Sequence, residues 1–129
     1  MTHDHDDNTQ PRVRGDSGFT LIEVLIVVAI IALLAAIGIP QFIAYRNRAV
    51  DAQMKSDLRN AAVAVESYYA KKAVYPANLN EVEGFGFQPT NGVTLSLDMV
   101  SQNSYTITAA KPGGTQSSFI FTSTSGSIN

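Results

Sequence analysis

The longest hydrophobic stretch of the chain runs from Phe19 to Ile39, and its only polar residues are Thr20 and Glu23. As an α-helix, these 21 residues would extend roughly 31 Å, enough to cross the hydrocarbon core of a bilayer. The pattern therefore predicts one membrane-spanning helix over residues 19–40.

Helical periodicity continues past this run, but on one face only. Gly38 and Pro40 interrupt the run, and a proline removes one helical hydrogen bond. We expect a kink at Pro40 and not an end, because the helical pattern resumes at Gln41. Over residues 41–72 the spacing of apolar positions predicts an amphipathic helix. Its apolar stripe comprises Ile43, Val50, Met54, Leu58, Ala61, Val65 and Tyr69, and the charged positions Arg46, Arg48, Lys55, Asp57, Arg59 and Glu66 fall mostly off it.

Beyond the helix the pattern changes to that of strands and turns. Tyr75-Pro76 requires extended backbone, and residues 76–92 are expected to form a loop with room for a helical turn around Asn78–Val82. Three runs with strand character follow, joined by turns short enough for antiparallel hairpins: 93–99, 105–109 and 118–123. The predicted fold is α+β, with a long N-terminal helix packed on a three-stranded antiparallel sheet and residues 73–129 forming the loop and sheet of a globular head.

The first 18 residues are polar and lack apolar periodicity, which predicts a disordered leader. They contain two arginines and four aspartates, so the leader accounts for the formal charge of −2 and the rest of the chain is neutral. A neutral chain lacks the broad positive field that attracts nucleic acid, and no direct nucleic-acid binding is expected.

Candidate chemistry is sparse. The only histidines, His3 and His5, lie in the leader, and the chain has no cysteine. No nucleophile–base pattern and no phosphate-binding glycine loop follows Gly18, which leaves little for acid–base or nucleophilic catalysis. We therefore expect a protein that is not an enzyme, with no cofactor and no metal site, and with no disulfide to stabilise the head.

The segment Gly18-Phe19-Thr20-Leu21-Ile22-Glu23-Val24-Leu25-Ile26-Val27-Val28 resembles the cleavage and assembly signature of type IV prepilins and their pseudopilin relatives. The resemblance extends through Ile39-Pro40-Gln41-Phe42 and Ser56-Asp57-Leu58-Arg59-Asn60 and weakens after Pro76. It implies that a membrane aspartyl peptidase, the prepilin peptidase, removes residues 1–18 by cutting between Gly18 and Phe19. The peptidase would then methylate the new amine of Phe19. A small residue before the cut allows close approach to the backbone.

Glu23 is the most informative single residue of this signature. A carboxylate inside a membrane helix costs about 2.5–3.5 kcal/mol at the bilayer centre, less near an end, and usually needs a partner. The implied cleavage creates an amine on Phe19, four residues earlier on the same helix face. Pairing with the amine of a neighbouring subunit would set the register of a growing filament. Thr20-x-x-Glu23 is also a capping box, so pairing and capping both stay open.

The resemblance further implies a membrane-stored subunit that assembles with copies of itself into a helical filament, the pilus, with the help of an inner-membrane assembly platform. The N-terminus would be cytoplasmic before assembly, and the pilus extracellular. Arg12 and Arg14 precede the span and Arg46 and Arg48 follow it, so charge alone does not decide this orientation. In the family, the helix before Pro40, here from about Ala32, can extend on assembly; a static kink is equally compatible with the sequence.

Three alternatives remain. A type II secretion pseudopilin shares the motif, but the major pseudopilin has an acidic calcium loop, and Asp98 is the only acid after Glu83 here. A minor pilin is also possible. A single-pass anchor with a periplasmic binding domain would explain the helix and strands but not Gly18, Phe19 and Glu23. The leader is longer and more acidic than that of typical major pilins. Adhesion, motility, DNA uptake and electron transfer are not distinguished.

Overall fold

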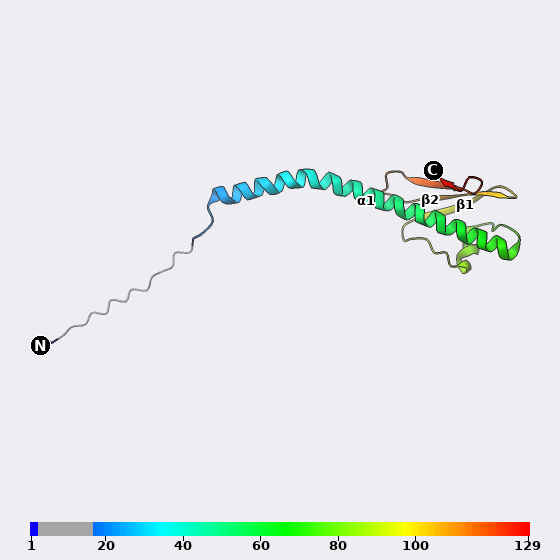
Figure 1. The fold of residues 1–129 in the computed structure, drawn as a ribbon, viewed down its shortest axis with the longest axis horizontal. Coiled ribbons are helices and arrows are strands. Elements are labelled where there is room, and N and C mark those ends of the chain that lie inside the picture. Colours follow the sequence, from blue (N-terminus) through cyan, green and yellow to red (C-terminus); the bar gives the residue numbers. More distant parts are fainter. Residues whose placement is uncertain (3–16) are drawn as a thin grey trace. The chain divides into compact units, whose positions relative to one another are not determined.

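A computed structural model describes residues 1–2 and 17–129 (Figure 1). The leader histidines, and the arginines at positions 12 and 14, lie outside the described residues. In chain order the elements are helix α1 (Leu21–Lys72), the short 3₁₀ helix η1 (Leu79–Phe85), and the strands β1 (Thr94–Ser101), β2 (Ser104–Ala110), β3 (Ser118–Thr122) and β4 (Ser127–Ile128). The chain divides at Gly38 into two compact parts.

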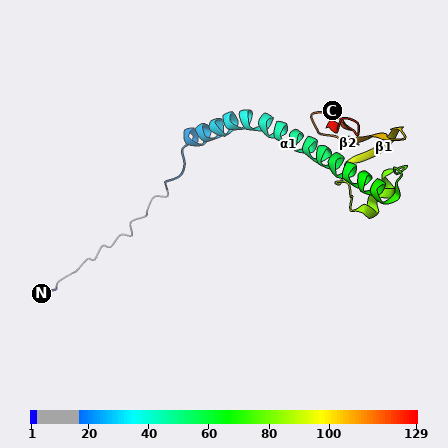
Figure 2. The same ribbon diagram turned by 45° about the vertical axis from the view of Figure 1, so that its right-hand side comes forward.

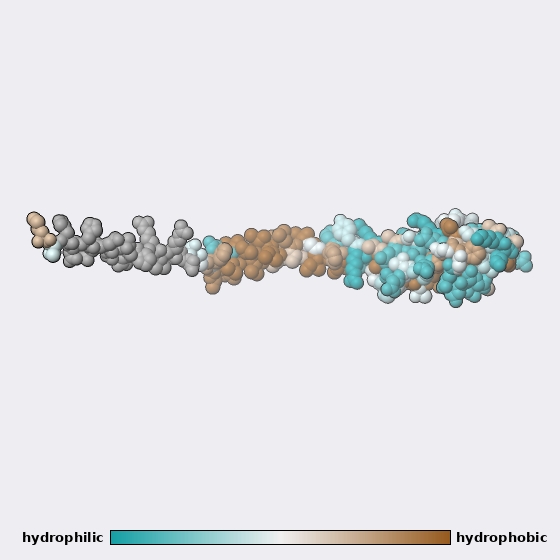
Figure 3. Space-filling model, turned by 90° about the horizontal axis from the view of Figure 1, so that it is seen from below, coloured by the Kyte–Doolittle hydropathy of each residue, from teal (hydrophilic) through white to brown (hydrophobic). Residues whose placement is uncertain are grey.

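Helix α1 contains 52 residues and continues through Pro40, which confirms that the helical pattern resumes after the proline. Its large apolar side chains from Leu21 to Ile39 are each at least 52% exposed. Figure 3 shows them as a continuous hydrophobic surface. The helix is long and apolar enough to cross a membrane by length and composition. At the other end, Lys71 and Lys72 lie in the last turn, where cations interact favourably with the helix dipole.

The sheet is an antiparallel meander in the order β1-β2-β3-β4. Leu97 pairs with Ile107, and Ile107 pairs with Phe121, so the three predicted strands and their hairpins are confirmed. The sheet has a fourth strand, β4, which the sequence pattern did not predict. Strand β4 pairs Ile128 with Phe121 after a turn at Gly126, whose φ of 63° suits glycine. Two residues in a serine-rich tail are too few to show strand periodicity.

The core lies between one face of this sheet and the C-terminal half of α1. Alternate residues of β2, namely Tyr105, Ile107 and Ala109, are buried there. From the predicted stripe, four residues are completely buried: Met54, Leu58, Ala61 and Val65. The buried face of the helix is wider than the stripe, because η1 and the loop after it cover α1 as well. Figures 1 and 2 both show η1 beside the helix, and its Val82 is fully buried.

Both ends of the predicted stripe lie outside the core. Ile43 is 52% exposed, so its predicted place on the sheet-packing face was wrong. Tyr69 is 39% exposed and stacks on Tyr75 with ring centroids 4.4 Å apart. Periodicity identifies the apolar face of a helix, but it does not say how far along that face the sheet extends.

Two buried carboxylates on α1 fasten loops of the head. Asp57 accepts hydrogen bonds from the backbone N–H and the hydroxyl of Thr90, at 2.8 and 2.9 Å. Asp51 accepts a bond of 2.8 Å from the backbone N–H of Thr115 and a second bond from its hydroxyl. The sequence placed Asp57 among the charged positions off the stripe. It is only 3% exposed, because the loop before β1 covers it.

Closer to the C-terminal end of α1, further side chains link the helix to the head. The Tyr105 hydroxyl donates to Glu66 at 2.8 Å, and the Tyr68 hydroxyl donates to Glu81 at 2.9 Å. Within the described residues, no buried side-chain nitrogen or oxygen lacks a hydrogen-bond partner. Side-chain hydrogen bonds therefore join α1 to the loops and strands of this cysteine-free head.

We predict that residues 46–129 form a soluble, monomeric domain with mixed α/β circular dichroism. Such a fragment lacks the exposed apolar half of α1 but keeps all the helix positions that are buried in the core, which begin at Asp51. A control fragment that starts at residue 62 loses Met54, Leu58 and Ala61 and should aggregate. Gel filtration and circular dichroism check both. An insoluble longer fragment, or one without strand signal, contradicts the architecture.

The stability of this fragment should depend on Asp51. Burial opposes ionisation of its carboxyl, but hydrogen bonds from Thr115 and Gln116 and the charge of Lys55 outweigh burial and hold the pKa of Asp51 below its usual 3.8. A lowered folded-state pKa stabilises the head above the unfolded-state pKa, and this contribution is lost as pH falls through the folded value. Stability should therefore decline below about pH 3.8, and less steeply in Asp51→Asn.

At neutral pH, Asp51→Ala should lower the free energy of unfolding by about 1–3 kcal/mol, since the two hydrogen bonds from Thr115 to a buried, charged acceptor are lost. Asp98, an exposed strand carboxylate, provides the matched control. Asp98→Asn should change stability by no more than about 0.5 kcal/mol. Urea titrations of the fragment measure both effects, and equal losses in the two variants would contradict the role of Asp51.

Candidate processing and assembly site

The predicted cleavage site lies immediately before α1 and is open. Gly18 is exposed, and a Cβ added to it would meet no atom within 4 Å. Phe19 is 89% exposed. Nothing in the described chain thus requires glycine at position 18, so a requirement for a small residue there would have to come from an enzyme that grips this backbone.

Thr20 and Glu23 form a reciprocal cap on the first turn of α1. The backbone N–H of Thr20 donates to Glu23 Oε2 at 3.0 Å, and the backbone N–H of Glu23 donates to Thr20 Oγ1 at 3.3 Å. The first helical bond then runs from the Val24 N–H to the Thr20 carbonyl at 3.3 Å. These bonds satisfy donors that every helix N-terminus leaves unpaired. The capping geometry anticipated for Glu23 is confirmed.

Capping leaves the Glu23 carboxylate able to take another partner. A carboxylate has about four acceptor positions, and the bond from Thr20 uses one. Apart from Glu23 itself, the shallow groove beside the carboxylate is lined by apolar residues, among them Phe19, Val24 and Val27. An ion pair formed against such side chains is less screened than one in water. The site can therefore cap the helix and still bind a cation.

Gly38 and Pro40 both lie inside α1, in the region predicted to kink or extend. A Cβ at Gly38 would meet nothing within 4 Å, so packing within the described chain does not explain this glycine. Pro40 has no N–H to donate to the carbonyl of Ala36, which weakens the helix locally. Extension of this segment stays a prediction.

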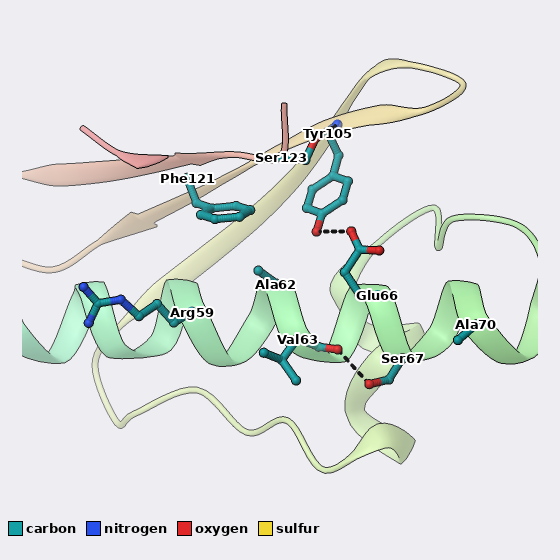
Figure 4. A pocket seen from close by; sticks show the side chains of 9 residues that line it. All are labelled: Arg59, Ala62, Val63, Glu66, Ser67, Ala70, Tyr105, Phe121 and Ser123. Carbon is teal, nitrogen blue, oxygen red and sulfur yellow. Dashed lines mark hydrogen bonds between the residues drawn. The ribbon is translucent and has the colours of Figure 1, made fainter. Parts of the chain in front are cut away.

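The head carries an open groove between α1 and the sheet, of which Figure 4 shows the lining. Glu66 and Tyr105 face each other across it. Burial, together with the hydrogen bond to Glu66, raises the pKa of Tyr105 well above its usual range. The phenol therefore stays protonated and acts as a donor, which makes this pair a structural link. Sequence reasoning missed it, because no local pattern connects residues 39 positions apart.

These features define a class of protein. One helix begins with an open, capped segment and exposes an apolar surface of membrane-spanning length, while a separate α+β head is built on the rest of the same helix. The arrangement fits a chain that one helix anchors in a membrane, with the first turn of that helix exposed.

Comparisons with known proteins identify the family. Residues 13–39 match the model of the prokaryotic N-terminal methylation motif. The type IV wide pilus major component PilA4 of Thermus thermophilus is 41% identical over 104 residues, which are 80% of this chain and 79% of that protein. The chain belongs to the type IV pilin family, as the signature around Gly18 and Glu23 predicted.

For two further relatives, the match covers a smaller share of the relative's own length. The type IV major pilin protein PilA of Myxococcus xanthus is 44% identical over 82 residues, which are 64% of this chain and 34% of that protein. The type II secretion system core protein G of Pseudomonas aeruginosa is 35% identical over 77 residues, which are 60% of this chain and 54% of that protein. The chain is thus similar both to pilins and to a secretion-system protein. Among these three relatives, the match to PilA4 covers the largest share of both chains.

Proposed function

We propose that the chain is a structural subunit of a type IV pilus, processed before Phe19 and assembled through its N-terminal helix. The observation that carries the proposal is the open Gly18-Phe19 bond directly ahead of a helix turn capped by Glu23. Similarity to PilA4, a wide pilus major component, along most of both chains supports the same role. The proposed role is structural and not catalytic, as the names of the pilin relatives suggest.

In this proposal the chain has four parts with separate tasks. Residues 1–18 are the leader that the prepilin peptidase removes. Residues 19–40 span the inner membrane before assembly and form the filament core afterwards. Residues 41–72 continue the helix into the head, which residues 73–129 complete. The N-terminus is cytoplasmic, and an assembly platform in the inner membrane transfers subunits into the extracellular pilus.

A pseudopilin of a type II secretion system is the second candidate, and the similarity to core protein G favours it specifically. That similarity covers 54% of the relative, against 79% for PilA4. The two roles differ in the product: a pilin is the most abundant polypeptide of sheared surface filaments, whereas a pseudopilin stays with a short periplasmic filament. Mass spectrometry of sheared filaments distinguishes them.

Cleavage should occur between Gly18 and Phe19, leaving a methylated N-terminus on Phe19. Gly18→Val should stop it, because a branched side chain crowds the scissile bond while disturbing nothing in the chain itself. Gly18→Ala, which keeps a small residue, should still be cut. The N-terminal sequence and mass of the membrane-extracted protein measure processing. A mature N-terminus elsewhere, or normal processing of Gly18→Val, contradicts this site.

The same cleavage would prepare Glu23 for assembly. The new amine of Phe19 carries a positive charge one residue before Thr20, whose N–H already bonds to Glu23. An incoming subunit would offer its own amine to the carboxylate of a neighbour, and only the correct axial register would pair the charges. An unpaired carboxylate in an apolar environment is costly, so a wrong register is disfavoured.

Two variants separate pairing from capping. Glu23→Gln keeps an acceptor for the Thr20 N–H but removes the charge, so membrane insertion and cleavage should persist while filaments are lost. Thr20→Ala removes one arm of the cap, at a cost of about 1 kcal/mol, but keeps the charge, so filaments should persist. The measurement compares processed subunit in the membrane with sheared filament for each variant. Abundant Glu23→Gln filament would contradict pairing and leave Glu23 as a capping residue.

A further inference from the structure

A short exposed segment of α1 follows the apolar run and has a different composition. Phe42 is 70% exposed and Tyr45 is 65% exposed, although both are large aromatic side chains. Arg46 and Arg48 are exposed as well, and the Arg48 guanidinium carbon lies 5.9 Å from the centroid of the Tyr45 ring. We call these four residues the collar. None of them belongs to the core of the head.

The collar is a purely cationic stretch. Between Glu23 and Asp51, its two arginines are the only charged residues of the sequence. The carboxylate of Asp51 is itself occupied by Thr115. The collar therefore combines aromatic rings with positive charges that have no acidic neighbour along the helix for several turns toward the N-terminus, and the Asp51 carboxylate on the other side is bonded to Thr115.

Helix geometry relates the collar to a bilayer. At 1.5 Å per residue, positions 42–48 follow Phe19 by roughly 35–44 Å along the helix. A hydrocarbon core is about 30 Å thick, and the bilayer with its headgroups about 40–45 Å. If residues 19–39 fill the core, the collar lies at the level of the headgroups. Aromatic residues favour this layer, and arginine binds phosphate with two parallel hydrogen bonds.

We infer that the collar binds the headgroups of anionic phospholipids and so sets the depth of the subunit in the membrane. The inference rests on the membrane-stored stage of the proposed function. It commits to lipid because the collar continues the membrane-spanning run and carries charge complementary to phosphate. The Arg48 guanidinium lies over the Tyr45 ring at the end of a flexible side chain. It can therefore reach outward to a phosphate while the ring stays at the apolar boundary.

The test uses the full-length precursor, purified in detergent and incubated with an equimolar mixture of phosphatidylcholine and phosphatidylglycerol. The lipids that remain bound are quantified by mass spectrometry. Wild type should retain phosphatidylglycerol preferentially, and each arginine should contribute about fivefold, equal to about 1 kcal/mol. The double variant Arg46→Gln/Arg48→Gln should lose most of the preference. Arg59→Gln, an exposed arginine of the head, is the matched control and should keep it.

A depth measurement supplements this test, since the chain has no cysteine and a single one can be introduced. A fluorophore on Ala49→Cys should be quenched best by headgroup-labelled lipid, and Phe42→Ser/Tyr45→Ser should weaken that quenching. Unchanged lipid preference in the double arginine variant, or equal loss in Arg59→Gln, overturns the inference. Because the uncleaved precursor is used, a failure of processing or of filament formation leaves this result unaffected. If the double arginine variant binds lipid normally but forms no filament in cells, the collar contacts a neighbouring subunit instead, and the lipid inference is overturned.

Discussion

The first half of α1 exposes an apolar surface that the described chain does not cover. Every large apolar side chain from Leu21 to Ile39 is more than half exposed, and burying such surface is worth about 25 cal/mol per Å². In the proposed function, lipid or the helices of other copies cover this surface. A membrane before assembly and a filament core afterwards are two solutions of the same constraint, and the head must then be stable by itself.

Glu23 is the one charge within this apolar surface, and its geometry gives it two consistent tasks. Its bond to the Thr20 N–H satisfies a helix donor that would otherwise lose its partner in an apolar environment. That bond leaves acceptor capacity unused, so the carboxylate remains available to a cation. Cleavage before Phe19 would create that cation within one residue of the cap. Processing would thereby convert a residue that starts a helix into one that also recognises a neighbour, without rearranging the turn.

Local patterns predicted the parts of the fold that local physics determines. The apolar run, most of the helix stripe and the three main strands can each be recognised from the spacing of apolar residues in a single sequence. The capping box is likewise a local signal, since its two residues are three positions apart. Strand β4 and the buried carboxylates could not be read this way. Asp57 is buried because a loop 33 positions later folds over it, and Glu66 bonds Tyr105 across 39 positions. Such links depend on the assembled tertiary structure, as does the extent to which the sheet covers Ile43.

The same helix that exposes the apolar surface also holds the loops of the head. Asp57 fastens the loop before β1 and Asp51 fastens the loop between β2 and β3, so both anchors of the sheet lie on α1. Backbone at Gly114 comes so close to Asp51 that an added Cβ would contact its carboxylate and lie 2.9 Å from the Gln116 carbonyl oxygen. In this head without cysteine, the close approach adds to the hydrophobic core between the sheet and the helix. Because the hydroxyls of Thr90 and Thr115 complete these anchors, the two loops that carry them are fixed to the helix by their own side chains.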